Sequence, residues 1–125
     1  MPSYARCLQW GALLREAVTS FPAPLRVAVL GSGGMSHSIG EPTMGRIDEA
    51  FDARCCELLR DGDPAALAAY LESATDAAGN GAHEMRNWAI AHAAAGARGF
   101  ELLDYLAVQE VYVGCGWAAW DVRAV

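Results

Sequence analysis

Apolar residues recur every three or four positions over residues 3–20, a spacing that predicts an amphipathic helix. Pro22 and Pro24 remove backbone donors directly after this pattern and should end the helix. Residues 25–30 then form a short apolar run with a single charge, at Arg26. Such a run is typical of a central strand covered on both faces. The glycine-rich residues 31–37 follow it.

Three further helices are predicted after the glycine-rich segment. Residues 43–59 place apolar side chains on one helical face. Asp63 is suited to cap the next helix, because Pro64 occupies its first position. After a glycine turn, Asn80 is suited to cap a last helix that continues to about residue 95.

The C-terminal part predicts strands over residues 100–106 and 108–113, with a glycine turn at residues 114–116. We therefore expect one α/β domain, residues 1–125, in which helices flank a partial sheet. Since 54% of the residues are hydrophobic, a missing segment or a partner should cover part of this sheet. Four late aromatic residues are expected in the core or an interface rather than in a substrate platform: Tyr105, Tyr112, Trp117 and Trp120.

Charge and composition exclude several classes of function. The formal net charge is -6, and all nine basic residues are arginines, so we expect no nucleic-acid partner and no P-loop. No apolar stretch approaches the ~18 residues that a membrane span requires, and the N-terminus does not resemble a signal peptide. We therefore expect a soluble, cytoplasmic protein whose four cysteines are reduced and mostly buried.

His37 is the first candidate for chemistry. An imidazole with a pKa near ~6.5 suits proton transfer at neutral pH, and Gly33 and Gly34 would let a substrate approach the backbone closely. The alternative is an ordinary hydrogen-bonded histidine after a glycine turn. The segment lacks the third glycine of a dinucleotide-binding fingerprint, so a nucleotide site is not indicated.

Glu84 is the second candidate, because it borders an apolar stripe at the start of its helix. An acid there complements the helix dipole by about 0.3–1 kcal/mol, which is the structural alternative. A carboxylate beside a buried stripe needs an arginine or a metal, and Arg86 points about 200° away around the helix. His92 lies about 12 Å along the axis, too far to share an ion, and is expected to pack in the core. The chain thus offers one carboxylate ligand and one base, but not a complete coordination shell.

Residues 27–37, 47–52 and 81–88 resemble the C-terminal half of the catalytic subunit of class III extradiol ring-cleavage dioxygenases, the protocatechuate 4,5-dioxygenase type. Residues 101–105 and 114–116 also fit, so the similarity spans nearly the whole chain. Gly-Gly-Met-Ser-His and Glu-Met-Arg-Asn-Trp are its most specific elements, and they are more telling together than alone.

The resemblance implies a non-haem Fe(2+) enzyme that opens a catecholic ring with O2 in aromatic catabolism. In this family two histidines and one glutamate hold the iron. By position Glu84 matches the glutamate ligand, and His37 matches the acid/base that deprotonates the catechol. A ring carboxylate on the substrate would pair with Arg46, Arg86 or Arg98, which the sequence does not rank.

The two histidine ligands of the family lie in its N-terminal half, which this sequence does not match. His83 stands where relatives carry a small polar residue and is not a ligand candidate. The histidines would come from an N-terminal complement, supplied by a partner chain or a homo-oligomer. The alternatives are a non-catalytic structural or regulatory subunit, or a metal-dependent hydrolase or other member of the superfamily.

Overall fold

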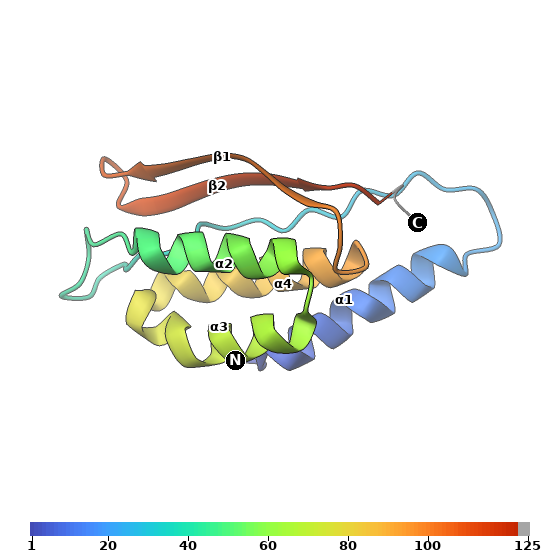
Figure 1. Cartoon of the computed structure of the whole chain (residues 1–125), viewed down its shortest axis with the longest axis horizontal. Coiled ribbons are helices and arrows are strands. Elements are labelled where there is room, and N and C mark those ends of the chain that lie inside the picture. The colour runs from blue at the N-terminus through green and yellow to red at the C-terminus, as the bar shows by residue number, and fades with distance from the viewer. Residues whose placement is uncertain (123–125) are drawn as a thin grey trace.

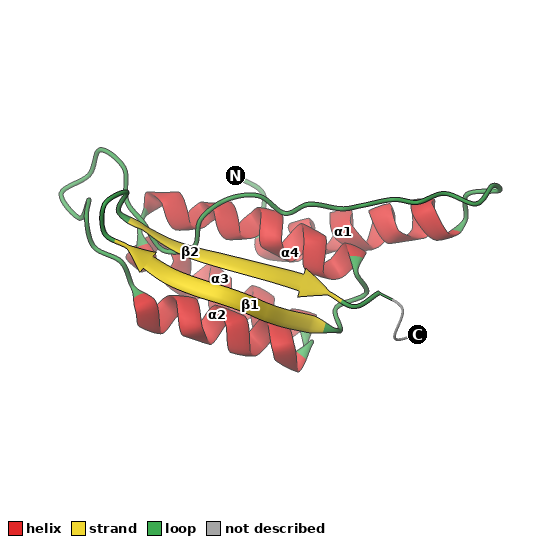
Figure 2. Cartoon of the chain, turned by 90° about the horizontal axis from the view of Figure 1, so that it is seen from above, coloured by secondary structure: helices red, strands yellow, loops and turns green. Residues whose placement is uncertain are grey.

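A computed structural model describes residues 1–122 of the chain as a layer of helices covered on one face by a β-hairpin (Figure 1). Strands β1 and β2 pair antiparallel, and the helices lie on one face of the hairpin (Figure 2). The expected α/β class, a partial sheet with flanking helices, is confirmed. The elements in chain order are α1 (Tyr4–Thr19), α2 (Glu49–Asp61), α3 (Pro64–Ala78), the 3₁₀ helix η1 (Asn80–Glu84), α4 (Met85–Ala94), β1 (Phe100–Val108) and β2 (Val113–Trp120).

The helix ends follow the capping signals of the sequence. Ser3 caps α1 by accepting the Arg6 N–H at 3.2 Å. Asp63 caps α3 by accepting the N–H groups of the second and third helical residues, with Pro64 at the first position as predicted. Gly62 ends α2 in the left-handed conformation, with φ of 74°.

The core lies between the helices and the hairpin. The N-terminal half of α1 packs against α4, where Gly11 allows close approach: an added Cβ would meet Ile90 O and the Ala93 side chain. The C-terminal half of α1 projects past this contact and leaves Leu14 and Val18 exposed (Figure 1). The largest apolar side chains that are fully buried are Tyr4, Met35, Leu59, Leu67, Leu71 and Met85.

The strand predicted at residues 25–30 is not formed. The segment is extended, but among residues 1–122 nothing pairs with the backbone of residues 23–31 through a hydrogen bond. It runs back from the end of α1 across the helices (Figure 2). Val29 and Leu30 are 43% and 89% exposed. The prediction was wrong because an apolar run becomes a central strand only where neighbouring strands flank it.

Two predicted helix starts also differ. The helix expected from residue 43 begins at Glu49, because turns occupy residues 41–45 and Asp48 forms the N-cap by accepting the Phe51 N–H at 3.0 Å. The helix expected from Asn80 begins as η1. The Asn80 amide does not cap it but instead exchanges two hydrogen bonds with the backbone of Ile39, at 2.8 and 2.9 Å.

The turn between the two strands lies later than the predicted break at residue 107, and the glycine turn predicted at residues 114–116 is not formed. β1 continues to Val108, the turn occupies residues 109–112, and β2 contains both Gly114 and Gly116. These glycines stand within a strand because their neighbours leave no space for side chains. A Cβ at Gly114 would overlap the Asp52 carboxylate, and one at Gly116 would lie 3.0 Å from the Met35 sulfur.

Several remaining expectations can be compared with the structure. Tyr105 and Trp120 pack against the core as expected, whereas Tyr112 and Trp117 are 41% and 51% exposed. All four cysteines are free thiols, and three of them are buried. Within residues 1–122, no helix is long and apolar enough to cross a membrane.

Candidate functional site

The two segments singled out in the sequence meet at the start of α4. The Asn87 side-chain amide donates to the Ser32 carbonyl at 2.8 Å, and the Trp88 indole N–H donates to the Gly33 carbonyl at 3.1 Å. These bonds join residues about 55 positions apart in the chain. The glycine-rich segment is therefore fixed on the helix terminus that carries Glu84.

His37 is held at the inner side of this junction and is 6% exposed. Its Nδ1 lies 2.9 Å from the Met35 carbonyl oxygen, which can only accept, so Nδ1 carries the proton. In the neutral ring Nε2 is then the basic nitrogen. The His37 carbonyl in turn accepts the Gly81 N–H at 3.0 Å, which fixes the backbone beneath the ring.

Glu84 faces His37 from the last residue of η1. Its side chain is 47% exposed, and Oε2 accepts the Gly34 N–H at 2.6 Å. The same oxygen lies 3.9 Å from His37 Nε2, farther than a direct hydrogen bond allows. The structure therefore brings the two predicted residues together, with a basic nitrogen and a carboxylate oxygen on facing sides.

The surrounding glycines make room for these two side chains. A Cβ at Gly81 would overlap the His37 ring, and one at Gly33 would lie 2.6 Å from the Cβ of Glu84. Gly33 has a φ of 124°, which only glycine adopts readily. The expectation for Gly33 was space for a substrate; in the structure the Glu84 side chain occupies that space.

A buried carboxylate, not predicted from the sequence, supports the segment from below. Asp52 on α2 is 1% exposed and accepts hydrogen bonds from Ser36 and from the Tyr105 hydroxyl. Burial raises the pKa of this carboxyl, and the bonds from Tyr105 and Ser36 oppose the rise. The sequence held a signal for it, since Asp52 lies on the apolar face of α2 one turn before Cys55 and Cys56.

The other two histidines have structural surroundings. His92 is fully buried, as predicted, and its Nδ1 accepts the Trp120 indole N–H at 2.9 Å. Burial lowers the pKa of His92 to about 4. His83 Nε2 lies 2.9 Å from Asp76 Oδ1, and its Nδ1 contacts Arg86.

The three candidate arginines lie in different places. Arg86 stacks over the Tyr4 ring at 4.4 Å and donates to the Pro2 carbonyl, away from Glu84. Arg98 lies in the connection from α4 to β1, at the opposite end of α4 from Glu84. Arg46 lies in the segment that leads from His37 to α2, where it pairs with Asp48 at 3.1 Å. Arg46 is thus the only one of the three that lies on the segment directly following His37.

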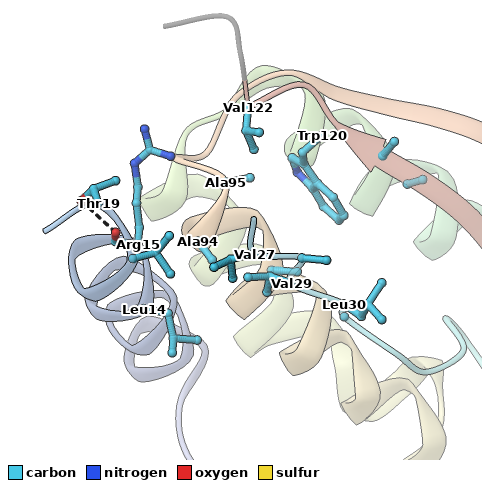
Figure 3. A pocket seen from close by; sticks show the side chains of 16 residues that line it. Leu14, Arg15, Thr19, Val27, Val29, Leu30, Ala94, Ala95, Trp120 and Val122 are labelled. Atoms are coloured by element: carbon cyan, nitrogen blue, oxygen red, sulfur yellow. Dashed lines mark hydrogen bonds between the residues drawn. The ribbon is translucent and has the colours of Figure 1, made fainter. Parts of the chain in front are cut away.

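Residues 1–122 contain no group of three His, Cys, Asp or Glu side chains that could hold a metal ion. Glu84 supplies one carboxylate. A pocket of about 620 Å³ lies elsewhere (Figure 3), and neither His37 nor Glu84 lines it. There Val27 and Val29 lie between Leu14 of α1 and Trp120 of β2.

In this α/β fold a glycine-rich segment presents a histidine to a carboxylate. Residues 1–117 match the catalytic LigB subunit of aromatic ring-opening dioxygenase. The chain belongs to this family. It is also similar to a gallate dioxygenase of Pseudomonas putida, with 36% identity over 59 residues, which are 47% of this chain. The matched part is 17% of that enzyme, so the chain corresponds to a small part of its length.

Proposed function

We propose that this chain contributes Glu84 and His37 to an iron-dependent extradiol dioxygenase that opens a catecholic ring with O2. The main observation behind this proposal is that His37 Nε2 and Glu84 Oε2 face each other at 3.9 Å. The Met35 carbonyl sets the tautomer of His37 by accepting its Nδ1–H. Family membership and the similarity to a gallate dioxygenase support ring opening as the reaction class. In this proposal the substrate is a small catecholic compound from aromatic catabolism.

The residues of this chain fit one position of a ferrous site. Glu84 would bind the ion, since its half-exposed carboxylate has an oxygen, Oε1, that accepts no hydrogen bond within residues 1–122. Two histidines and one carboxylate are the usual donors for non-haem Fe(II) in oxygenases. The two histidines would come from an N-terminal complement on another segment or chain. Bound ferrous iron would supply the redox chemistry with O2.

His37 would act as the acid/base. Because Nδ1 is committed to the Met35 carbonyl, Nε2 can take a proton from a catechol hydroxyl and later return it. The Glu84 carboxylate would stabilise the imidazolium at the observed separation of 3.9 Å. Because His37 is only 6% exposed, exchange of this proton with water would be limited.

The complement would dock on residues 23–31. This segment is extended, its backbone makes no hydrogen bond within the described chain, and its apolar side chains are exposed. A strand added along this edge would satisfy the backbone and cover Val27 and Val29. Such a strand would enter close to Gly31, which packs against Asn87 and Ala91 on α4.

A chimera tests the proposal. Residues 1–117 of this chain, which match the family and carry both candidate residues, replace the corresponding part of the Pseudomonas putida gallate dioxygenase. Anaerobic Fe(II) titration should give one ion per chimeric chain, and gallate with O2 should be turned over. Glu84→Gln should abolish tight iron binding. His37→Gln should retain iron and lower kcat by about 10²–10⁴-fold.

Glu57→Gln is the matched control, because Glu57 is an exposed acid on α2 whose partner is Arg54. It should leave iron binding and turnover unchanged. If Glu84→Gln binds iron as the parent chimera does, the ligand role is wrong. A folded chimera that binds no iron would instead favour the alternative, a non-catalytic structural or regulatory subunit.

A further inference from the structure

The buried carboxylate of Asp52 makes three hydrogen bonds beneath the candidate site. Oδ1 accepts the Ser36 N–H at 2.8 Å. Oδ2 accepts the Ser36 hydroxyl at 2.8 Å and the Tyr105 hydroxyl at 2.6 Å. Every donor is neutral, and no arginine pairs with Asp52 among residues 1–122. Burying a carboxylate without a positively charged partner is costly. A residue that only filled space at this position would not need to be an acid.

Ser36 transmits the position of Asp52 to the backbone on both sides. Its hydroxyl donates to Asp52 and accepts the Asp48 N–H at 2.8 Å, so both its donor and its acceptor are used. Its carbonyl accepts the Gly114 N–H at 2.9 Å, and the neighbouring Met35 N–H donates to the Gly114 carbonyl at 2.8 Å. Helix α2 therefore holds the Met35–Ser36 peptide, and strand β2 holds the two peptides that flank it.

The Met35–Ser36 peptide includes the acceptor of the His37 ring. The Met35 carbonyl belongs to the peptide between Met35 and Ser36, and it receives the His37 Nδ1–H at 2.9 Å. Its orientation is fixed by the Ser36 N–H, which lies on the same planar peptide and points at Asp52. A rotation of this peptide would therefore break the bond to Asp52 and the bond to His37 together.

Strand β2 approaches Asp52 very closely at Gly114. A Cβ at Gly114 would overlap Oδ2 of Asp52, so glycine at this position admits the carboxylate between α2 and β2. Tyr105 on β1 closes the other side with its hydroxyl. Helix and both strands thus converge on one carboxylate, immediately below the peptide that orients the histidine.

We infer that Asp52 is a positioning residue, which selects the Nδ1–H tautomer of His37 by fixing the Met35–Ser36 peptide through its bonds to Ser36. This inference rests on the proposed function for its catalytic consequence, because Nε2 of His37 must be the basic nitrogen there. The tautomer itself is a property of this chain and can be measured without iron, substrate or complement.

The test begins with NMR of the ¹⁵N-labelled chain, in which long-range ¹H–¹⁵N correlations distinguish the two histidine tautomers. The parent chain should show His37 as the Nδ1–H form. Asp52→Ala should give a mixture of tautomers and a broadened ring signal. Asp52→Asn should restore much of the parent signal, because its amide oxygen can still accept the Ser36 N–H.

Two further variants separate positioning from a general loss of packing. Ser36→Ala keeps the backbone bond to Asp52 and should shift the tautomer less than Asp52→Ala does. Asp63→Ala removes a structural carboxylate that caps α3 and should leave the His37 signal unchanged. If Asp52→Ala does not fold, Ser36→Ala carries the test, and it should then show a partial shift of the tautomer. A folded Asp52→Ala variant, or in its absence a folded Ser36→Ala variant, with the parent His37 spectrum would overturn the inference.

The chimera supplies the second readout. There Asp52→Ala should retain iron binding and KM and lower kcat by about tenfold to a hundredfold, as for groups that orient a functional side chain, whereas Asp52→Asn should recover much of this loss. A changed tautomer with no activity in any chimera would leave the positioning role intact and reject the proposed function. Unchanged kcat in an active Asp52→Ala chimera would reject the positioning role and leave the proposed function intact.

Discussion

Residues 23–31 and residues 35–38 are neighbours in the chain and differ in almost every physical respect. The first segment is nearly all exposed and makes no hydrogen bond within residues 1–122. The second is buried throughout, and Met35 and Ser36 are 0% exposed. Yet the first segment is the more apolar of the two, since it contains Leu25, Val27, Val29 and Leu30.

The reason for this inversion is where the partners of each segment lie. Residues 35–38 receive theirs from α2, β2 and η1, all of which this chain contains. Residues 23–31 meet the helices on one side, and no described strand lies within hydrogen-bond distance. Apolar sequence thus produces burial only where a second surface is available. The comparison separates a segment whose partners lie within the described chain from one whose backbone has no hydrogen-bond partner among residues 1–122.

A matched pair of truncations should show the largest difference between the two segments. Met35→Ala should lower the free energy of unfolding by about 2–5 kcal/mol, because a fully buried side chain leaves a cavity. Leu30→Ala should change it by no more than about 0.5 kcal/mol, because this side chain is 89% exposed. Urea unfolding measures both. Similar losses for both variants would mean that residues 23–31 are covered in solution.

The pH dependence of stability tests whether water reaches His92 on α4, the helix that residues 23–31 cross. Burial lowers the pKa of His92 from 6.5 to about 4. As pH falls through this interval the unfolded chain takes up a proton and the folded chain does not, so stability is complete above pH ~6.5 and declines below it. The interval corresponds to about 3 kcal/mol.

Urea unfolding between pH 4 and 7.5 should therefore show a steeper decline for the parent chain than for His92→Leu. Leu30→Ala, in which an exposed side chain that does not titrate is truncated, serves as the control and should keep the parent slope. Equal slopes for the parent and His92→Leu would show that water reaches His92 past Trp120, which lines the open groove.

Two glycine substitutions distinguish crowding at the site from backbone strain. Gly81→Ala should lower the free energy of unfolding by about 1–3 kcal/mol and displace His37, because the added Cβ would overlap its ring. Gly40→Ala meets open space but has a φ of 67°, so it should lower stability by about 1 kcal/mol and leave His37 in place. Thermal unfolding and the His37 NMR signal together measure these effects. An unchanged His37 signal in Gly81→Ala would contradict the close packing.

Two helix starts with local capping signals were predicted correctly, whereas the predicted cap at Asn80 was wrong. Ser3 and Asp63 with Pro64 mark two helix starts by chemistry that acts within four residues. The glycine turn failed as a prediction because Gly114 is required by a contact with Asp52, which lies 62 positions away in the chain. Sequence periodicity contains no information about such a contact, so residues 114–116 were predicted as a turn, whereas residues 109–112, which form the turn, were predicted within a strand.

The candidate site shows the same division. His37 and Glu84 could be identified because each residue type is unusual for its local setting, and the structure places them 3.9 Å apart. The support from Asp52 and Tyr105 depends on the packing of α2 against the hairpin, and Tyr105 was assigned only to the core or an interface. Single-residue chemistry was thus accessible from the sequence, whereas the contacts that orient it required the tertiary structure.

Thiol reactivity gives the smallest expected effect and compares the two regions without disturbing the fold. Cys7, Cys55 and Cys56 are buried, and burial raises the pKa of Cys56 to about 11, so these thiols should react slowly. Cys115 on β2 is partly exposed and should react first with an aromatic disulfide reagent, as one thiol per chain. Cys115→Ser should remove this fast phase and change the free energy of unfolding by no more than about 0.5 kcal/mol.

The fast phase also reports on what covers the hairpin, since Cys115 stands between the two glycines that contact Asp52, Met35 and Trp88. Addition of a complement that docks only along residues 23–31 should leave the Cys115 rate unchanged. A slower Cys115 reaction on complement binding would place the covering segment over the hairpin as well. The exposed edge and the supported site would then be parts of a single interface rather than two independent regions.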